Sequence, residues 1–122
     1  PHALIDAFQS TLQEAADADL LLHVVDVASP QRDERIAEVL RVLGEIGAGE
    51  VPQILVANQV DRLDGTERPR APVDAVELPD GRSVPRVFTS ARTGEGLDAL
   101  RAAIAEAARV GSLAQGAADA TY

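Results

Sequence analysis

The apolar positions of the chain follow two spacings, one typical of helices and one typical of buried strands. Between positions 4 and 18, apolar side chains recur about every four residues, which predicts a helix with one buried face. Residues 20–26 and 53–58 are instead almost continuously apolar over the length of a strand. Such runs are typical of strands that are covered on both faces of a parallel sheet.

The same alternation continues toward the end of the chain. A helix is predicted between the two strands, over residues 30–46, and a third strand over residues 86–90. Apolar positions from residue 97 onward predict a last helix that ends near Gly111. The remaining residues, 111–122, are expected to form a flexible tail.

One interval breaks this alternation. Residues 62–85 contain several prolines and show neither a helical nor a strand period, which predicts a long loop. Within it, the turn Pro-Asp-Gly-Arg at 79–82 has Val76 before it and Val84 after it. This arrangement is compatible with a short hairpin.

Helices that alternate with buried strands predict an α/β fold. Right-handed crossovers between consecutive strands make the strands parallel and place helices on both faces of the sheet. We therefore expect a three-layer domain with three parallel strands over residues 1–110. Ligands of such sheets bind beyond the carboxyl ends of the strands, where Asp26, Asn58 with Asp61, and Ser90 would converge.

Composition limits the chemistry that this domain can perform. A chain of 122 residues, 46% hydrophobic and 25% charged, is long enough for one soluble domain. The absence of cysteine excludes disulfides, thiol catalysis and cysteine-bound zinc, and two histidines far apart do not favour a metal site. A net charge of −9 argues against a direct grip on nucleic acid by these residues. All eleven basic residues are arginines, so lysine-dependent phosphate binding is excluded within them.

The ends of the chain and its hydropathy suggest where the protein resides. No apolar run approaches the ~20 residues that span a bilayer, and the first residues lack the pattern of a signal peptide. We therefore expect a cytoplasmic protein with no membrane partner. Because the chain begins with Pro1 and contains no methionine, we interpret it as a fragment of a longer product.

Two short motifs at the predicted strand ends indicate recognition of a guanine base. The sequence NQVD (58–61) follows the second strand, and SAR (90–92) ends the third. The Asp61 carboxylate can accept two parallel hydrogen bonds from neighbouring N–H donors, which guanine offers and adenine does not. Asn58 can brace the loops and contact the base, while the backbone of residues 90–92 would bring N–H groups to the opposite base edge.

These motifs resemble those of a known family. NQVD resembles the Asn-Lys-x-Asp guanine motif of P-loop GTPases, and TSARTGEGL (89–97) resembles their Ser-Ala motif. The run from residue 1 to about residue 110 closely resembles the later half of the G domain in the HflX family of ribosome-associated GTPases. The resemblance implies a partial G domain over 1–110 that binds GTP or GDP through Asn58, Gln59, Asp61, Ser90, Ala91 and Arg92.

Other parts of the family's nucleotide site do not occur in this sequence. In HflX proteins an Asp-x-x-Gly motif comes just before such an opening and a phosphate loop earlier still, and neither is present here. By resemblance, the parent protein hydrolyses GTP with Mg²⁺ and acts on ribosomes, whereas these residues alone are not expected to hydrolyse it. Gln59 stands where the family has lysine, which predicts weaker nucleotide affinity with the guanine preference kept by Asp61.

Two other interpretations remain open. Asn58 and Asp61 are also residue types that form turns and caps. The chain could therefore be a non-catalytic α/β interaction module whose guanine motif has decayed, as Gln59 suggests, or part of another translation-related GTPase. A phosphate loop and an Asp-x-x-Gly upstream in the parent reading frame would argue against the decayed module.

Further expectations concern residues beside the base motifs. Asp26 is interpreted as a strand-end residue that accepts hydrogen bonds from loop N–H groups, and His23 as a hydrogen-bonded core histidine. Glu95 is assigned to a turn and helix start, with no chemistry. Strand 20–26 would be an unpaired apolar edge, so we expect a homodimer formed through this strand or through helix 4–18.

Overall fold

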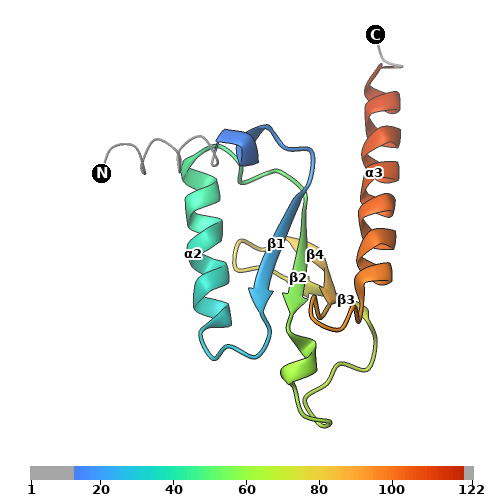
Figure 1. Cartoon of the computed structure of the whole chain (residues 1–122). Helices are drawn as coiled ribbons and strands as arrows, with labels where there is room; N and C mark the ends of the chain where they lie inside the picture. The colour runs from blue at the N-terminus through green and yellow to red at the C-terminus, as the bar shows by residue number, and fades with distance from the viewer. Residues whose placement is uncertain (1–12, 120–122) are drawn as a thin grey trace.

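The computed structural model describes residues 13–119, and it describes side chains for residues 13–110. A short helical turn at residues 13–17 is followed by alternating strands and helices, which confirms the predicted alternation (Figure 1). In chain order the elements are β1 (Leu21–Asp26), α2 (Arg32–Glu45), β2 (Gln53–Asn58), the 3-10 turn η1 (Val60–Arg62), β3 (Val73–Glu77), β4 (Ser83–Phe88) and α3 (Leu97–Asp119).

The strands form one mixed sheet in the order β1-β2-β4-β3. β1 pairs with β2 in parallel, and β2 pairs with β4 in parallel, as predicted. β3 pairs antiparallel with β4. The prediction of three parallel strands was therefore incomplete, because the interval 62–85 supplies β3 as an antiparallel edge strand and not only a loop.

The β3–β4 hairpin explains why the third predicted strand begins earlier than expected. Ser83 pairs with Glu77, so β4 starts at Ser83 and not at residue 86. Gly81 has φ 91°, a left-handed conformation that favours a tight turn between the two strands. After Phe88 the chain leaves the sheet, and Ser90, predicted to end the strand, lies in the following turn.

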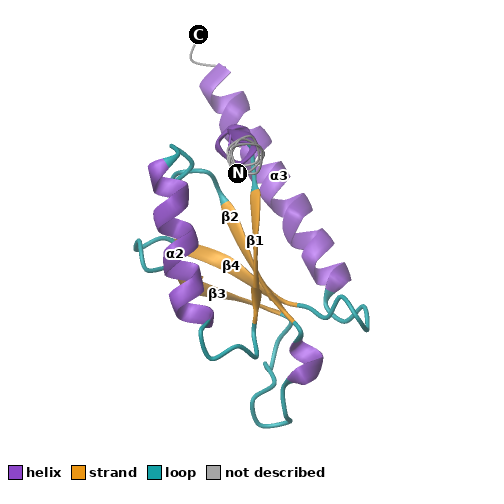
Figure 2. Ribbon diagram, turned by 60° about the vertical axis from the view of Figure 1, so that its left-hand side comes forward, coloured by secondary structure: helices purple, strands orange, loops and turns teal. Residues whose placement is uncertain are grey.

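Helices cover both faces of the sheet, which confirms the predicted three layers (Figure 2). Successive residues of a strand point to opposite faces, so each strand supplies two separate cores. On the α2 side the buried core consists of Val25, Ile36, Leu55, Leu78 and Val84. On the other side, α3 places Leu100, Ala103 and Ile104 against the buried sheet residues Ile54, Val56 and Val87.

The last helix is longer than predicted. The sequence pattern predicts its end near Gly111, whereas α3 continues to Asp119. A glycine in a helix interior is about 1 kcal/mol less favourable than alanine, and the alanines that follow Gly111 are the best helix formers. A single glycine is therefore too weak a signal to end a helix in a sequence of this composition.

The first predicted helix, residues 4–18, is described only in part. Residues 13–17 are helical, while Leu4, Phe8 and Leu12 lie outside the described residues. None of the described helices combines the length and the apolar content that crossing a bilayer requires.

Candidate functional site

Asn58, the last residue of β2, connects two loops that are far apart in the sequence. Its side-chain oxygen Oδ1 accepts hydrogen bonds from the backbone N–H of Ala91 and from the hydroxyl of Thr89, each at 3.1 Å. An amide oxygen offers two acceptor positions, so both are used here, and the Nδ2 group is the part of the side chain left to donate to a ligand. Asn58 therefore holds the 90–92 turn against the end of β2.

Backbone hydrogen bonds reinforce this contact. The N–H of Val60 donates to the carbonyl of Thr89 at 3.0 Å, and the N–H of Thr89 donates to the carbonyl of Ala57 at 2.9 Å. Between them, Gln59 has φ 68° and ψ 33°, a left-handed conformation that is uncommon for a residue with a side chain. This conformation turns the chain directly from β2 into η1, which places Asp61 at the end of the strand.

The turn after β4 is held by its own hydrogen bonds. Ser90 is fully buried, its hydroxyl accepts the N–H of Thr93 at 3.2 Å, and its own N–H donates to the carbonyl of Glu95 at 2.8 Å. The backbone of residues 90–92 was expected to present its N–H groups to a base edge. In the structure the N–H groups of Ser90 and Ala91 donate to acceptors within the protein, the carbonyl of Glu95 and Oδ1 of Asn58, so their contact with a base stays a prediction.

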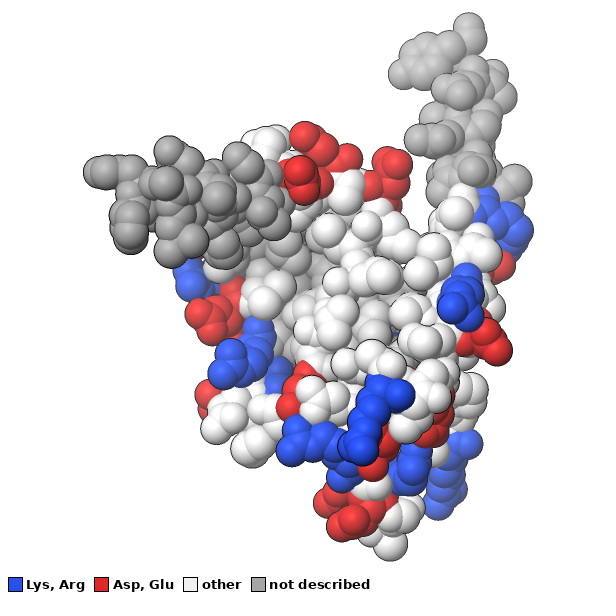
Figure 3. Space-filling view, in the orientation of Figure 1, with Lys and Arg blue, Asp and Glu red and all other residues white. Residues whose placement is uncertain are grey.

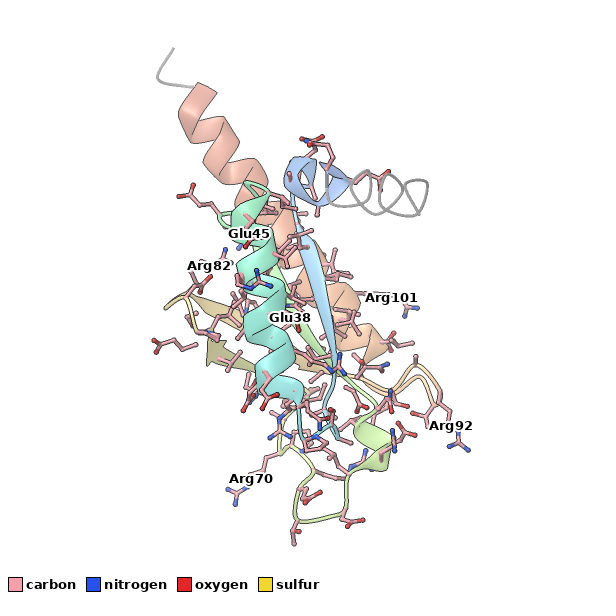
Figure 4. The ribbon with its side chains drawn as sticks, turned by 90° about the vertical axis from the view of Figure 1, so that its left-hand side faces the viewer. Glu38, Glu45, Arg70, Arg82, Arg92 and Arg101 are labelled. Carbon is pink, nitrogen blue, oxygen red and sulfur yellow. The ribbon has the colours of Figure 1, made fainter. Side chains whose placement is uncertain are left out.

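Arg92 is the third residue of this predicted set. Of the three backbone N–H groups at positions 90–92, that of Arg92 is the one without an acceptor in the described part of the chain. Its side chain extends outward from the turn, away from the end of β2 (Figure 4). A contribution of Arg92 to the site would therefore come from its main chain.

Gly96 ends the turn in a conformation that requires glycine. It has φ 79°, and a Cβ atom at this position would lie 2.0 Å from the carbonyl oxygen of Phe88. Such a contact is far shorter than a non-bonded carbon–oxygen separation, so a larger residue would displace the backbone. Gly94, with φ 85°, has open space around it. The close approach at Gly96 therefore fixes the turn against the end of β4.

Asp61 lies in η1, half-buried and close in sequence to Asn58. Among the described residues, no hydrogen-bond donor or cationic side chain reaches its carboxylate; the nearby Arg62 contacts Gln59 and Asp26 instead. The Gln59 Oε1 atom accepts a hydrogen bond from Arg62 at 2.7 Å, so its amide is directed toward Arg62. Among the described residues, the acceptor positions of the Asp61 carboxylate are therefore not used by a hydrogen bond or an ion pair.

Two interpretations of strand residues are confirmed. Asp26 accepts a hydrogen bond from the N–H of Ala28 at 2.9 Å through Oδ1, as expected of a strand-end carboxylate. His23 is buried, and its Nδ1 atom lies 3.3 Å from Oε1 of Gln53. Burial lowers the pKa of His23 below its ordinary value of 6.5, and the hydrogen bond to Gln53 opposes this shift only in part. His23 is therefore a neutral core histidine at pH 7.

Two cavities border α2, and the base motifs contribute to neither. The first, of about 470 Å³, is lined by apolar residues such as Ile36, Leu55 and Leu78. The second, of about 800 Å³, includes Arg32 and Arg70. The NQVD and SAR residues are absent from the linings of these two cavities. Over the described residues, no group of three or more His, Cys, Asp and Glu side chains is placed to hold a metal ion.

Two residues that hold the loops together were not predicted from the sequence. Thr89 belongs to the TSAR segment but was not singled out; its burial and its hydroxyl bond to Asn58 make it part of the connection. Arg68 lies in the aperiodic interval 62–85, where no pattern marks individual residues. Its guanidinium contacts the carboxylate of Glu95, at 2.6 Å and 2.7 Å from the two oxygens.

Comparison with known proteins finds relatives over most of this chain. The GTPase HflX of Escherichia coli strain K12 is 44% identical over 106 residues, which are 87% of this chain and 24% of the relative. The GTPase HflX of Caldanaerobacter subterraneus is 43% identical over 104 residues, 85% of this chain and 21% of the relative. That of Lacrimispora saccharolytica is 43% identical over 100 residues, 82% of this chain and 22% of the relative. Over these residues the chain belongs to the HflX family.

This HflX-family chain spans less than a quarter of the length of these curated relatives. No protein-family model matches it. Its mixed four-stranded sheet with helices on both faces is consistent with part of a G domain. The family predicted from NQVD and SARTGEG is confirmed, and the loops that contain these motifs are the ones that Asn58 ties together.

Proposed function

We propose that this chain forms the guanine-recognition part of a GTP-binding domain. The observation that supports this most directly is the contact between the two motifs, in which Asn58 Oδ1 accepts the N–H of Ala91 at 3.1 Å. The contact brings the NQVD and SAR loops to one end of the sheet, beyond the carboxyl ends of β2 and β4. Ligands of parallel sheets bind at that end.

The chemistry of the proposed site follows from the groups that remain free. The Asp61 carboxylate accepts two parallel hydrogen bonds from the donor edge of guanine. The Nδ2 group of Asn58 donates to an acceptor on the other edge, together with the backbone N–H of Arg92. Adenine lacks the paired donors that Asp61 requires, so binding it leaves a half-buried carboxylate unpaired, which is unfavourable.

We assign only recognition of the base to these residues. Phosphate cradles use a Gly-x-x-x-x-Gly-Lys loop and a hydroxyl that binds Mg²⁺, and the printed sequence contains no such motif. We therefore assign phosphate and Mg²⁺ binding, GTP hydrolysis and action on ribosomes to a longer cytoplasmic protein that includes this chain. Gln59, held by Arg62 in place of the family's lysine, is expected to weaken the affinity without changing the guanine preference.

A titration followed by NMR tests the base site directly. The ¹⁵N-labelled chain is titrated with guanosine and, as a matched control, with adenosine. We expect guanosine to shift the side-chain amide of Asn58 and the backbone amides of Asp61 and Arg92, and adenosine to leave them in place. Equal shifts with both nucleosides, or shifts confined to the cavities beside α2, would support the alternative of an interaction module.

We also propose that the chain forms a homodimer through the edge of β1. In the described sheet, β1 pairs only with β2, and its outer edge is open. Leu22 and Val24, on the α3 face of this strand, are 44% and 59% exposed. Figure 3 shows a surface between α2 and α3 that is largely free of charged side chains. Open strand edges next to apolar surface favour pairing with another strand.

A further inference from the structure

Arg68 and Glu95 form an ion pair between the two loops of the proposed base site. The Nη2 atom of Arg68 lies 2.6 Å from Oε1 and 2.7 Å from Oε2 of Glu95. The two residues are 27 positions apart, so the pair is a tertiary contact and not a feature of a single turn. It adds a side-chain ion pair to the hydrogen bonds that already connect these loops, such as those of Asn58 with Ala91 and of Val60 with Thr89.

The main chain of Glu95 is hydrogen-bonded within the SAR turn. Its carbonyl accepts the N–H of Ser90 at 2.8 Å, and its N–H donates to the Thr93 hydroxyl at 3.2 Å. It lies between two glycines with positive φ, Gly94 and Gly96, and the close approach of Gly96 to Phe88 holds this end of the turn against β4. A contact made by the Glu95 side chain therefore restrains the position of the turn that contains Ser90 and Arg92.

Arg68 belongs to the loop that contains Asp61. Its N–H donates to the carbonyl of Asp64 at 3.0 Å, and the N–H of Glu67 donates to the same carbonyl at 2.9 Å. This compact turn follows η1 by two residues, so Arg68 is anchored close to Asp61 along the chain. The Arg68–Glu95 ion pair thus connects the loop that contains Asp61 to the SAR turn.

We propose that the Arg68–Glu95 pair sets the width of the base site, by holding Asp61 at a fixed separation from the backbone of residues 90–92. This inference rests on the proposed guanine site and names two positioning residues for it. Asn58 and Val60 close the inner side of the loops at the end of the sheet, and the ion pair closes the outer rim. Fixing both sides pre-organises the site, which reduces the entropy lost when a base binds.

Because the Arg68–Glu95 pair is exposed, its role in positioning the base site can be distinguished from a role in stabilising the fold. The side chains of Arg68 and Glu95 are 37% and 51% exposed. Ion pairs in such surroundings contribute little to the stability of a fold and are weakened by salt. The pair should therefore change nucleotide affinity while leaving the unfolding transition almost unchanged.

The test uses the full-length protein with GDP as the probe and compares Arg68→Gln, Glu95→Gln, the double variant and the swap Arg68→Glu/Glu95→Arg. Arg41→Gln is the control, because Arg41 forms another solvent-exposed ion pair, with Glu45 at 2.8 Å on α2. Glu45 lies far from the turn of Arg92 (Figure 4). Each variant is measured for GDP affinity at low and high salt, and for its urea unfolding midpoint.

We expect each single variant to weaken GDP binding about threefold, the size of an exposed ion pair. The double variant should be no weaker than the single ones, and the swap should recover most of the affinity. The differences should shrink at high salt, and all unfolding midpoints should match that of Arg41→Gln. Unchanged GDP affinity in both single variants would overturn the inference, as would a loss of affinity accompanied by an equal loss of stability.

A variant of Asp61 distinguishes failure of this inference from failure of the proposed function. If Asp61→Asn loses its preference for GDP over XDP while Arg68→Gln binds GDP normally, the base site stands and the positioning role is wrong. If Asp61→Asn keeps that preference unchanged, the proposed function is wrong, and with it the inference that rests on it.

Discussion

The side chain of Asn58 and the backbone of Ala91 are joined by a 3.1 Å hydrogen bond across 33 positions of the sequence. Because the same oxygen also accepts the Thr89 hydroxyl, the amide oxygen of Asn58 performs a structural task, and the binding task that we propose for Asn58 falls to its amide nitrogen. The two tasks can be separated by substitution.

Asn58→Asp and Asn58→Ala are expected to differ. Aspartate keeps an oxygen that accepts from Thr89 and Ala91 but removes the Nδ2 donor, so stability should change by less than ~1 kcal/mol while guanosine binding is lost. Alanine leaves the buried Thr89 hydroxyl and the Ala91 N–H unpaired, which should lower the free energy of unfolding by about 2 kcal/mol. Urea unfolding and nucleoside titration of the two variants measure both effects. Equal stability loss in both would show that the oxygen is not the structural element.

Asp61→Asn is expected to change base preference in the full-length protein. A carboxamide presents a donor where guanine also donates, whereas xanthine presents an acceptor there. Affinity for GDP should fall and affinity for XDP should rise, so that the preference reverses, and competition titrations with the two nucleotides measure it. The exposed Asp98→Asn, on α3, is the control and should leave the ratio unchanged. A GDP preference retained by Asp61→Asn would mean that this carboxylate does not read the base.

Gly96→Ala and Gly94→Ala test the close approach between the SAR turn and β4. Both glycines have positive φ, so each alanine should cost about 1–2 kcal/mol from its backbone conformation. Only at Gly96 does the added Cβ meet the Phe88 carbonyl oxygen, at 2.0 Å. Gly96→Ala should therefore destabilise the chain more than Gly94→Ala, by a further ~1 kcal/mol or more. Chemical denaturation compares the two, and identical losses would contradict the contact.

His23 is expected to make stability depend on pH below neutrality. Its pKa in the folded chain lies below the ordinary 6.5, so the unfolded state binds the proton first as the pH falls. The free energy of unfolding is therefore fully retained above about pH 6.5 and decreases below it, by at most about 1.4 kcal/mol per pH unit for one proton. Unfolding measured from pH 7.5 to pH 5 should show this decrease, and His23→Gln should flatten it. The control is His2→Gln; if that variant also flattened the curve, the assignment to His23 would fail.

Self-association tests the open edge of β1. We expect the purified chain to sediment as a dimer at high concentration and Val24→Arg to sediment as a monomer, because a charge on the exposed face of β1 disfavours burial of that edge. Val110→Arg adds the same charge at a 52% exposed position on α3 and should remain dimeric. Hydrogen exchange of the Leu21–Asp26 amides should slow on dimerisation. A monomer at all concentrations would show that the unpaired edge of β1 does not cause self-association.

The parts of the fold that the sequence predicted are those with a period. β1 and β2 have continuous apolar runs, and their bounds were predicted within one residue. β3 was harder to see because its residues are mostly exposed on both faces, so neither alternation nor an apolar run marks it. Gly111 was given too much weight as a helix end, since tertiary and compositional context can override a single glycine.

At the candidate site, contiguous motifs could be recognised from the sequence, whereas contacts between residues far apart in the sequence could not. The residues that we propose to read the base could be named from their order in NQVD and SAR, because such motifs are contiguous. The hydrogen bonds that occupy the N–H groups of Ser90 and Ala91, and the contact of Arg68 with Glu95, depend on which residues meet in space. Because the interval 62–85 shows neither a helical nor a strand period, the sequence does not predict the contact between Arg68 and Glu95.

The two edges of the sheet are chemically unlike, and this difference limits how copies of the chain can add to one another. β3 is a short strand of five residues with Asp74 and Glu77 on it, features that discourage pairing, while β1 is apolar and open. A filament would need each copy to offer two edges that fit together. If the proposed pairing through β1 forms, one β1 meets another across a two-fold axis, antiparallel, and the joined sheet then ends in β3 on both sides. Such an assembly would stop growing at two copies.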